Sequence, residues 1–229
     1  MKKNITIGEI VAIDYRAAAV FKAAGIDFCC GGKKSIDETC SEKGIDRDEL
    51  VEKLEKLEST PNTTTHNFIE WEPGFLCDYI LNTHHKYVLK SLPELVSYTK
   101  KIASVHGERH PELEEVADLI SQISKELLQH MKKEEEVLFP SIKEAINSAS
   151  EKAKANIISE INRLSGEHEF AGGAMDKINV ITSNYLVPDD GCNSYHVTFK
   201  LLREFEDDLH IHVHLENNIL FPKALTAAN

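Results

Sequence analysis

One motif constrains the fold of this chain more than any other feature, because it occurs twice. His130 is followed four residues later by Glu134, and His212 is followed at the same spacing by Glu216. The tripeptide Leu-Phe-Pro begins four residues after each glutamate. Residues four apart lie one above the other on a helix face, so each pair can direct an imidazole and a carboxylate toward one point. Two such helices facing each other predict a buried dinuclear metal centre with bridging carboxylates.

A further histidine precedes each motif at nearly the same distance. His85 lies 45 residues before His130, and His168 lies 44 residues before His212. Both upstream histidines are followed by a charged, an aromatic and an apolar residue in that order. The two halves of the chain therefore match as helical hairpins. The same local pattern favours His85 over its neighbour His84, which stays open as an alternative.

Turn-forming residues lie where a bundle with level ligands requires them. Ligands on antiparallel helices share one height only if the turn falls midway between them, near residues 107, 149 and 190. Gly, Pro, Asn, Asp and Ser gather at residues 106–111, 147–150 and 188–193, and these are turn compositions. The sequence therefore predicts an all-α protein with an up-down-up-down four-helix bundle over residues 72–229.

Two other histidines lie beside the first of these turns. His106 and His110 are about 20 residues from the expected ligands, which is roughly 30 Å of helix at about 1.5 Å per residue. Pro93 predicts a kink in the first helix, because an interior proline lacks the N–H for the helix ladder. His106 is a candidate ligand only if the chain folds back there.

The donors expected at the centre are imidazoles and carboxylates, with no thiolate among them. They are His85, His130, Glu134, His168, His212 and Glu216. This donor set disfavours soft metals and structural zinc and favours iron or manganese. Ordinary core or surface roles for all six are disfavoured, since unpaired carboxylates are costly to bury. Two bridging glutamates and a bridging oxide or hydroxide would leave each metal an open position for a small molecule.

Three more carboxylates are expected near these donors. Glu126 and Asp208 each precede an expected ligand histidine by four residues, and Glu167 directly precedes His168. A carboxylate that accepts a hydrogen bond from a metal-bound imidazole fixes its tautomer and raises its basicity. Solvated positions or salt bridges are the alternative for these acids.

Residues 1–57 predict a small separate domain, joined to the bundle by a polar linker over residues 58–71. Three capping boxes predict three helices in it, opened by Thr6 with Glu9, Ser35 with Glu38, and Asp46 with Glu49. The first of these helices is expected to run to Gly25. Because a core of about 57 residues is marginal alone, the domain is expected to dock on another surface.

Two adjacent cysteines, Cys29 and Cys30, follow the first of these helices and precede two glycines and two lysines. Nearby positive charge and the N-terminus of the next helix predict lowered thiol pKa values, and glycines let a partner approach. We therefore expect accessible thiols that act in transfer or docking and do not hold metal in the bundle, with ordinary packing as the alternative. No role in this chemistry is expected for the other cysteines, Cys40, Cys77 and Cys192.

Charge and hydropathy exclude several classes of partner. The net charge of −12 and the pI near 5.4 argue against nucleic acids and anionic membranes. No apolar run approaches 18 residues, and Glu9 and Asp14 interrupt any signal core after the two lysines at the start. These features predict a cytoplasmic protein, and a homodimer is among the states they allow.

The order of the donors distinguishes two kinds of di-iron bundle. Ferritin-like bundles use Glu-x-x-His, whereas His-x-x-x-Glu with lone histidines on the alternate helices resembles the hemerythrin-like domains. The oxygen carriers of that group have an Asp five residues after the last histidine. This chain has Glu216 at four, which argues against reversible oxygen carriage.

The whole chain resembles the repair-of-iron-centres proteins of the ScdA/YtfE type over nearly its full length. The residues that carry the resemblance are Asp27–Gly32, Thr83–His85, His130–Glu135, Gly166–Glu169 and His212–Asn218. The resemblance implies two Fe ions per chain, with an oxo or hydroxo bridge, held by the six donors. It also implies that Glu126 and Glu167 lie close to the metals.

The same resemblance implies a function, namely repair of iron–sulfur clusters damaged by nitric oxide or peroxide, through donation of iron. Its partners would be damaged iron–sulfur proteins or a cluster scaffold, with nitric oxide or oxygen species as small ligands. An enzyme that reduces nitric oxide or a peroxide is the alternative, and a sensor or carrier of a diatomic gas is a further one. All three would begin at the same open pair of irons.

Overall fold

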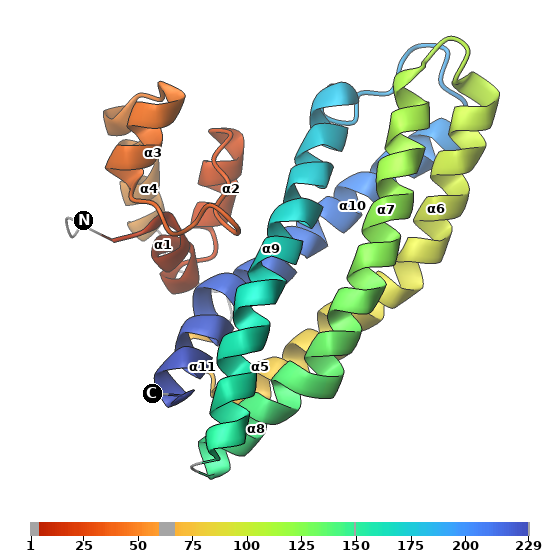
Figure 1. The fold of residues 1–229 in the computed structure, drawn as a ribbon. Coiled ribbons are helices and arrows are strands. Elements are labelled where there is room, and N and C mark those ends of the chain that lie inside the picture. The colour runs from red at the N-terminus through yellow and green to blue at the C-terminus, as the bar shows by residue number, and fades with distance from the viewer. Residues whose placement is uncertain (1–4, 60–66, 149, 229) are drawn as a thin grey trace.

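A computed structural model of the 229-residue chain describes residues 5–59, 67–148 and 150–228. The secondary structure of these residues is helical, apart from one β-bridge between Thr6 and Ser35. Figure 1 shows the long helical segments packed side by side, with a small N-terminal unit against one side of them. The expected all-α fold with a four-helix bundle is confirmed.

The four segments of the bundle are mostly composite. The first segment comprises α5 (Pro73–Ile80), the π turn η2 (Leu81–His85) and α6 (Lys86–His106). The second comprises α7 (Glu112–Lys133), the π turn η3 (Glu134–Leu138) and α8 (Phe139–Asn147). The third is α9 alone (Glu151–Ile181), and the fourth comprises α10 (Asn193–Leu215), the π turn η4 (Glu216–Leu220) and α11 (Phe221–Ala228). A short 3₁₀ helix, η1 (Phe68–Glu70), precedes α5. The connections between segments include the turn sites expected near residues 107 and 190, while residue 149, the third expected midpoint, lies outside the described residues.

The π turns lie at the height of the repeated motif. η2 ends at His85, η3 begins at Glu134 and η4 begins at Glu216. The prolines of the two Leu-Phe-Pro tripeptides follow η3 and η4. A proline has no N–H for an i−4 bond, so it favours a wider turn just before it. Single π turns occur frequently at functional sites because they redirect side chains.

α6 continues through Pro93 as one helix to His106. The chain does not fold back at the proline, so His106 stays at the far turn. Its Nε2 lies 3.1 Å from the Sγ of Cys192. His106 is therefore excluded from the ligand cluster, and Cys192 has a partner at that turn.

Two apolar clusters fill the bundle, one on each side of the ligand height. One contains Val88, Met131, Ala171 and Val213, and the other contains Ile80, Leu138, Leu164 and Leu215. His85, Glu134 and His168 lie between these positions on their segments, and His130, His212 and Glu216 directly adjoin one of them. A buried polar layer thus separates two hydrophobic cores.

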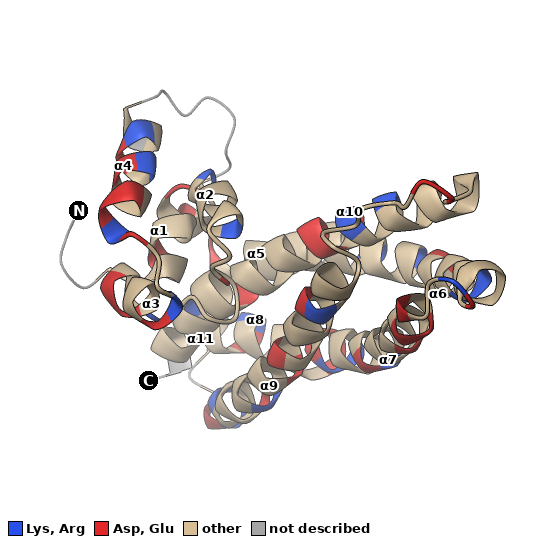
Figure 2. Ribbon diagram, turned by 90° about the horizontal axis from the view of Figure 1, so that it is seen from above, with Lys and Arg blue, Asp and Glu red and all other residues tan. Residues whose placement is uncertain are grey.

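The described residues of the N-terminal unit form four helices where three were expected. They are α1 (Ile7–Ile13), α2 (Ala17–Ala23), α3 (Ile36–Lys43) and α4 (Arg47–Glu58). The expected first helix is interrupted because Asp14 adopts an extended conformation and its carboxylate accepts from the N–H and the guanidinium of Arg16. The capping residues do open α1, α3 and α4, as expected. Along α4, charges of both signs alternate (Figure 2), with ion pairs from Glu49 to Lys53 and from Glu52 to Lys56.

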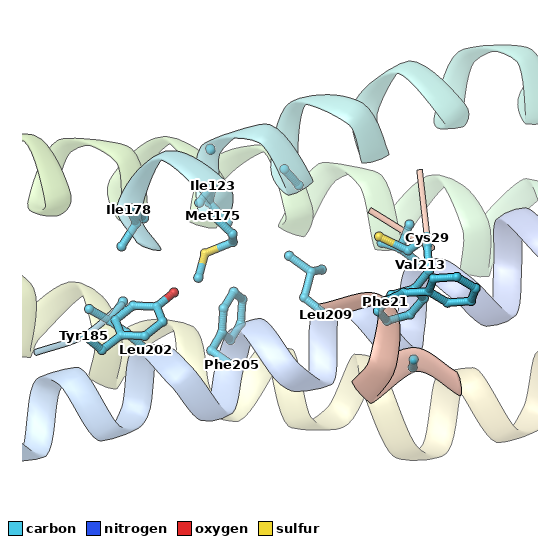
Figure 3. Packing of buried hydrophobic residues seen from close by; sticks show 14 of the residues in the cluster. Phe21, Cys29, Ile123, Met175, Ile178, Tyr185, Leu202, Phe205, Leu209 and Val213 are labelled. Atoms are coloured by element: carbon cyan, nitrogen blue, oxygen red, sulfur yellow. The ribbon is translucent and has the colours of Figure 1, made fainter. Parts of the chain in front are cut away.

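This unit is docked on the bundle through a shared core. Phe21 of α2 belongs to the same buried cluster as Leu209 and Val213 of α10, and Figure 3 shows Phe21 and Cys29 beside Val213. α1 also packs against α10 and η4. No helix in the described part of the chain is long and apolar enough to cross a membrane.

Candidate metal centre

The structure brings all six expected donors to one point, although they come from four different segments. They are His85, His130, Glu134, His168, His212 and Glu216, each at most 1% exposed. Their ligand atoms form two groups of four, and within each group these atoms lie within 4.8 Å of one another. One group contains His85 and His212, the other contains His130 and His168, and both glutamates belong to both groups.

Each glutamate lies against one histidine from each group. Oε2 of Glu134 is 3.4 Å from Nε2 of His85 and 3.3 Å from Nε2 of His130. Glu216 is 3.1 Å from Nε2 of His168 through one carboxylate oxygen and 3.1 Å from Nε2 of His212 through the other. A carboxylate placed in this way can bridge two cations, one in each group.

Several polar atoms in this layer have no hydrogen-bond partner among the described residues. Those that face the cluster include both carboxylate oxygens of Glu134, Oε2 of Glu216 and Nε2 of His85. Buried acceptors that lack donors, carboxylates above all, are costly in free energy. A pair of cations would satisfy them, and an all-nitrogen and oxygen donor set suits iron or manganese. The residues present therefore fit a dinuclear metal centre.

Without a cation, protons on His85 and His130, whose pKa values are raised, help to balance the carboxylates. Burial lowers the pKa of His130, but Glu134 and Glu167 outweigh burial and raise it to about 10. Burial likewise raises the pKa of Glu216, but the neighbouring histidines His212 and His168 hold it well below its usual range. Binding of metal must displace these protons, because metal-bound imidazole is neutral.

The outer ring nitrogens of three histidines are held by neighbouring side chains. Nδ1 of His85 lies 2.8 Å from Oε1 of Glu135, and Nδ1 of His130 lies 3.0 Å from Oε2 of Glu167. Nδ1 of His168 lies 2.9 Å from Oδ1 of Asn217. Acceptors at Nδ1 keep the proton there and leave the Nε2 lone pair directed into the cluster.

Glu167 thus contacts a donor, while the two other expected acids do not. Glu126 is exposed and has no hydrogen bond or ion pair among the described residues. Asp208 bonds Nδ1 of His84 at 2.9 Å and does not contact His212. Glu126 and Asp208 each lie four residues before a ligand histidine and so share its helix face. Nδ1 of an inward-facing histidine, however, points toward the neighbouring helix, and that helix supplies its hydrogen-bond partner.

Glu135 and Asn217 were missed, although the repeat contains a signal for them. Each directly follows a glutamate of the motif, so the two residues occupy equivalent positions in the two halves. His84 lies outside both donor groups. Its ring stacks on His212 with a centroid separation of 5.6 Å.

Both units of the chain match known families. Residues 78–224 match the Hemerythrin HHE cation binding domain, and residues 3–58 match ScdA_N, a Domain of Unknown function (DUF542). The iron-sulfur cluster repair protein YtfE of Pectobacterium atrosepticum is 34% identical over 226 residues, which are 97% of this chain and 97% of that protein. The iron-sulfur cluster repair protein ScdA of Staphylococcus epidermidis is 35% identical over 224 residues, 96% of this chain and 98% of that protein.

This chain belongs to the ScdA/YtfE family.

In this member of the ScdA/YtfE family, the environment of the paired cysteines differs from the one that the sequence predicted. Cys29 is 4% exposed, and its Sγ lies 3.2 Å from Oδ1 of Asp27. The hydrogen bond to Cys30, burial and the Asp27 charge raise the pKa of Cys29 well above its usual value. The prediction of a lowered thiol pKa is therefore wrong for Cys29. The carboxylate of Asp27 lies beside the thiols, whereas the positive charge of Lys34 is paired with Glu42.

The cysteine loop lies directly against the bundle's donor layer. Sγ of Cys30, which is half-buried, lies 3.5 Å from the carbonyl oxygen of His168. Asn217 donates to the carbonyl oxygen of Cys29 through its Nδ2, and Asn218 donates to the same oxygen at 3.0 Å. Asn217 therefore joins His168 to the cysteine loop through one side chain.

Proposed function

We propose that this chain is a di-iron protein that repairs iron–sulfur clusters damaged by nitrosative or oxidative stress, and that it does so by donating iron. The observation that carries the proposal is the buried pair of donor groups with two shared glutamates. Support comes from relatives that are named iron-sulfur cluster repair proteins and match nearly the whole chain.

The proposal assigns a role to each donor. His85 and His212 would hold one iron, His130 and His168 the other, and Glu134 and Glu216 would bridge them. Two imidazoles and two carboxylate oxygens per metal, with an oxo or hydroxo bridge, leave an octahedral ion one position open. The bound irons would supply labile metal and a binding position for nitric oxide or an oxygen species.

The surrounding residues would prepare the donors for this role. Glu135, Glu167 and Asn217 accept hydrogen bonds from the Nδ1–H groups of three histidines and so fix the direction of Nε2. The two apolar clusters exclude water from both sides of the polar layer.

We further propose that residues 1–57 form the unit that meets the client and that Cys29 and Cys30 act there in transfer or docking. Cys30 is the more accessible thiol and lies against the helix of His168. The clients would be damaged iron–sulfur proteins or a cluster scaffold in the cytoplasm, and the chain would act there alone or as a homodimer.

Iron transfer to a client tests the function. The iron-loaded full chain is incubated with a cluster-depleted iron–sulfur protein, and the iron content of both proteins is measured after separation. Donation predicts iron lost from this chain, gained by the client and matched by recovery of client activity. The variant Glu134→Leu, mixed with the same total iron, provides the control for free iron.

A reductase would give a different result. If nitric oxide or peroxide is consumed over many turnovers while the chain retains its iron and the client stays inactive, donation is wrong and the enzymatic alternative holds. Equal client recovery with Glu134→Leu would also contradict the proposal, because free iron would then account for it.

A further inference from the structure

A cavity of about 700 Å³ lies between the N-terminal unit and the bundle. Its walls include Lys22, Asp27 and Cys29 from the N-terminal unit, and Asp176 of α9 together with Glu206 and His210 of α10. None of these residues belongs to the six donors of the bundle. The cavity therefore carries its own set of polar side chains.

Three of these side chains have the composition and proximity of a metal site. One ligand atom each of Asp176, Glu206 and His210 lies within 4.8 Å of the others. Glu206 and His210 are four residues apart on α10, so they share one helix face. The order Glu-x-x-x-His reverses that of the motif in the bundle.

Burial leaves part of this cluster unsatisfied. Nδ1 of His210 is buried and has no hydrogen-bond partner in the described part of the chain. The ring of His210 packs against Phe28 in a T-shaped arrangement, at a centroid separation of 5.8 Å. Glu206 is 2% exposed, so its charge must be balanced locally.

At present the charge of Glu206 is balanced by one flexible cation. Nζ of Lys22 lies 2.8 Å from Glu206 and 2.6 Å from Asp207. The Lys22 side chain is 38% exposed. It can therefore leave Glu206 for solvent and still pair with Asp207. Oε2 of Glu206 would then keep only a long contact of 3.5 Å from Nδ2 of Asn179, whose closer partner is Oε1 at 3.2 Å.

We propose that Asp176, Glu206 and His210 bind a single divalent ion of the first transition series, such as Mn²⁺ or Fe²⁺, at the wall of this cavity. Two carboxylates and one imidazole are hard and borderline donors that suit these ions, and water completes the coordination. Metal–donor distances of about 2.0–2.2 Å require the donors to draw closer. Asp176, which is exposed, is free to make that movement.

The probe for this site is Mn²⁺ added to the iron-loaded full chain. Bound manganese and iron are counted by elemental analysis on the same sample, and free Mn²⁺ is followed by its electron paramagnetic resonance signal. We expect one bound Mn²⁺ per chain with no change in iron content. Because both metals are counted, failure of this site is distinguishable from failure of the di-iron assignment.

Variants locate the bound ion. Asp176→Asn and His210→Gln each weaken Mn²⁺ binding by about tenfold or more, since each removes a direct donor. His110→Gln is the matched control, because His110 likewise lies beside an acid, Asp190, but at the far turn. Lys22→Met strengthens binding, because it removes the cation that competes for Glu206.

Two results would overturn the proposal. One is a wild-type chain that binds no Mn²⁺ up to about 1 mM beyond its iron. The other is undiminished binding in Asp176→Asn, a surface substitution that leaves the fold intact, as circular dichroism would verify.

Discussion

At the scale of single residues, the two shared glutamates dominate the chemistry of the buried layer. Glu134 and Glu216 are fully buried, and carboxylate oxygens of both lack hydrogen-bond donors among the residues that the structure describes. A side chain of this kind is unstable in an apolar core unless a cation or protonated imidazoles balance it. The free-energy cost of burying Glu134 and Glu216 therefore depends on whether metal is bound.

The first prediction concerns metal stoichiometry. The wild-type chain should bind about two irons, and Glu134→Leu or Glu216→Leu should lose most of them, because each glutamate would contribute to both ions. His106→Gln should keep both irons, since His106 lies at the far turn beside Cys192. Full iron retention in Glu134→Leu, measured by elemental analysis, would contradict the ligand assignment.

A second residue-scale prediction concerns the acceptors at Nδ1. Glu135→Ala and Asn217→Ala should weaken iron binding by about ten- to a hundredfold, because the imidazoles of His85 and His168 lose the groups that orient them. Glu126→Ala is the control, since Glu126 is exposed and contacts neither histidine. Competition with a chelator measures all three affinities. Equal losses in Glu126→Ala would indicate a general charge effect.

At the scale of elements, local rules explain where helices begin better than where they stop. The capping residues Thr6, Ser35 and Asp46 open helices as their spacing indicates. The break between α1 and α2 depends on one side-chain interaction, the bond from Arg16 to Asp14. That interaction offers a measurable pH dependence.

The hydrogen bond from Arg16 lowers the pKa of Asp14 below its ordinary value of 3.8. A lowered pKa in the folded state means that Asp14 stabilises the fold at pH values above 3.8 and loses this contribution as the pH falls through its folded value. Asp14→Asn should therefore lower the free energy of unfolding by about 1 kcal/mol near neutral pH. The difference between the two proteins should shrink in acid. Urea unfolding at several pH values measures it, and a constant difference down to strong acid would contradict the assignment.

At the scale of the whole molecule, one polar layer divides the bundle core, and the N-terminal unit is docked beside it. Val213 and Leu215 are two residues apart on α10, yet they belong to different apolar clusters. The layer between the clusters gains little from hydrophobic burial, so its stability depends on what balances its charges.

Removal of iron should therefore destabilise the chain. We expect a fall in melting temperature of roughly 5–15 °C in the iron-free protein, because bound metal stabilises only the folded state. Hydrogen exchange should rise first near the π turns at His85, Glu134 and Glu216. Identical melting of the iron-loaded and iron-free proteins would argue against metal in this layer.

The cysteine loop gives a prediction for the docked unit. Cys29→Ser combined with Cys30→Ser should leave the iron content of the bundle unchanged and reduce iron delivery to a client severalfold. Cys192→Ser is the control, because Cys192 is exposed and lies at the far turn. Normal delivery by a folded double variant would end the transfer proposal, and loss of bundle iron would show that the loop supports the metal centre.

The sequence by itself determined the bundle and the convergence of its six expected donors. Both depend on the helical period and on the turn positions. These are local properties, and the spacing of His85, His130, His168 and His212 in the sequence indicates them. Domain boundaries and metal ligation stay predictions. The tertiary structure alone decided which acids reach the imidazoles, because Nδ1 partners come across helix interfaces whose rotation no local pattern specifies. It also decided that Asp176 meets His210, since α9 and α10 bring these two residues together only in the folded chain.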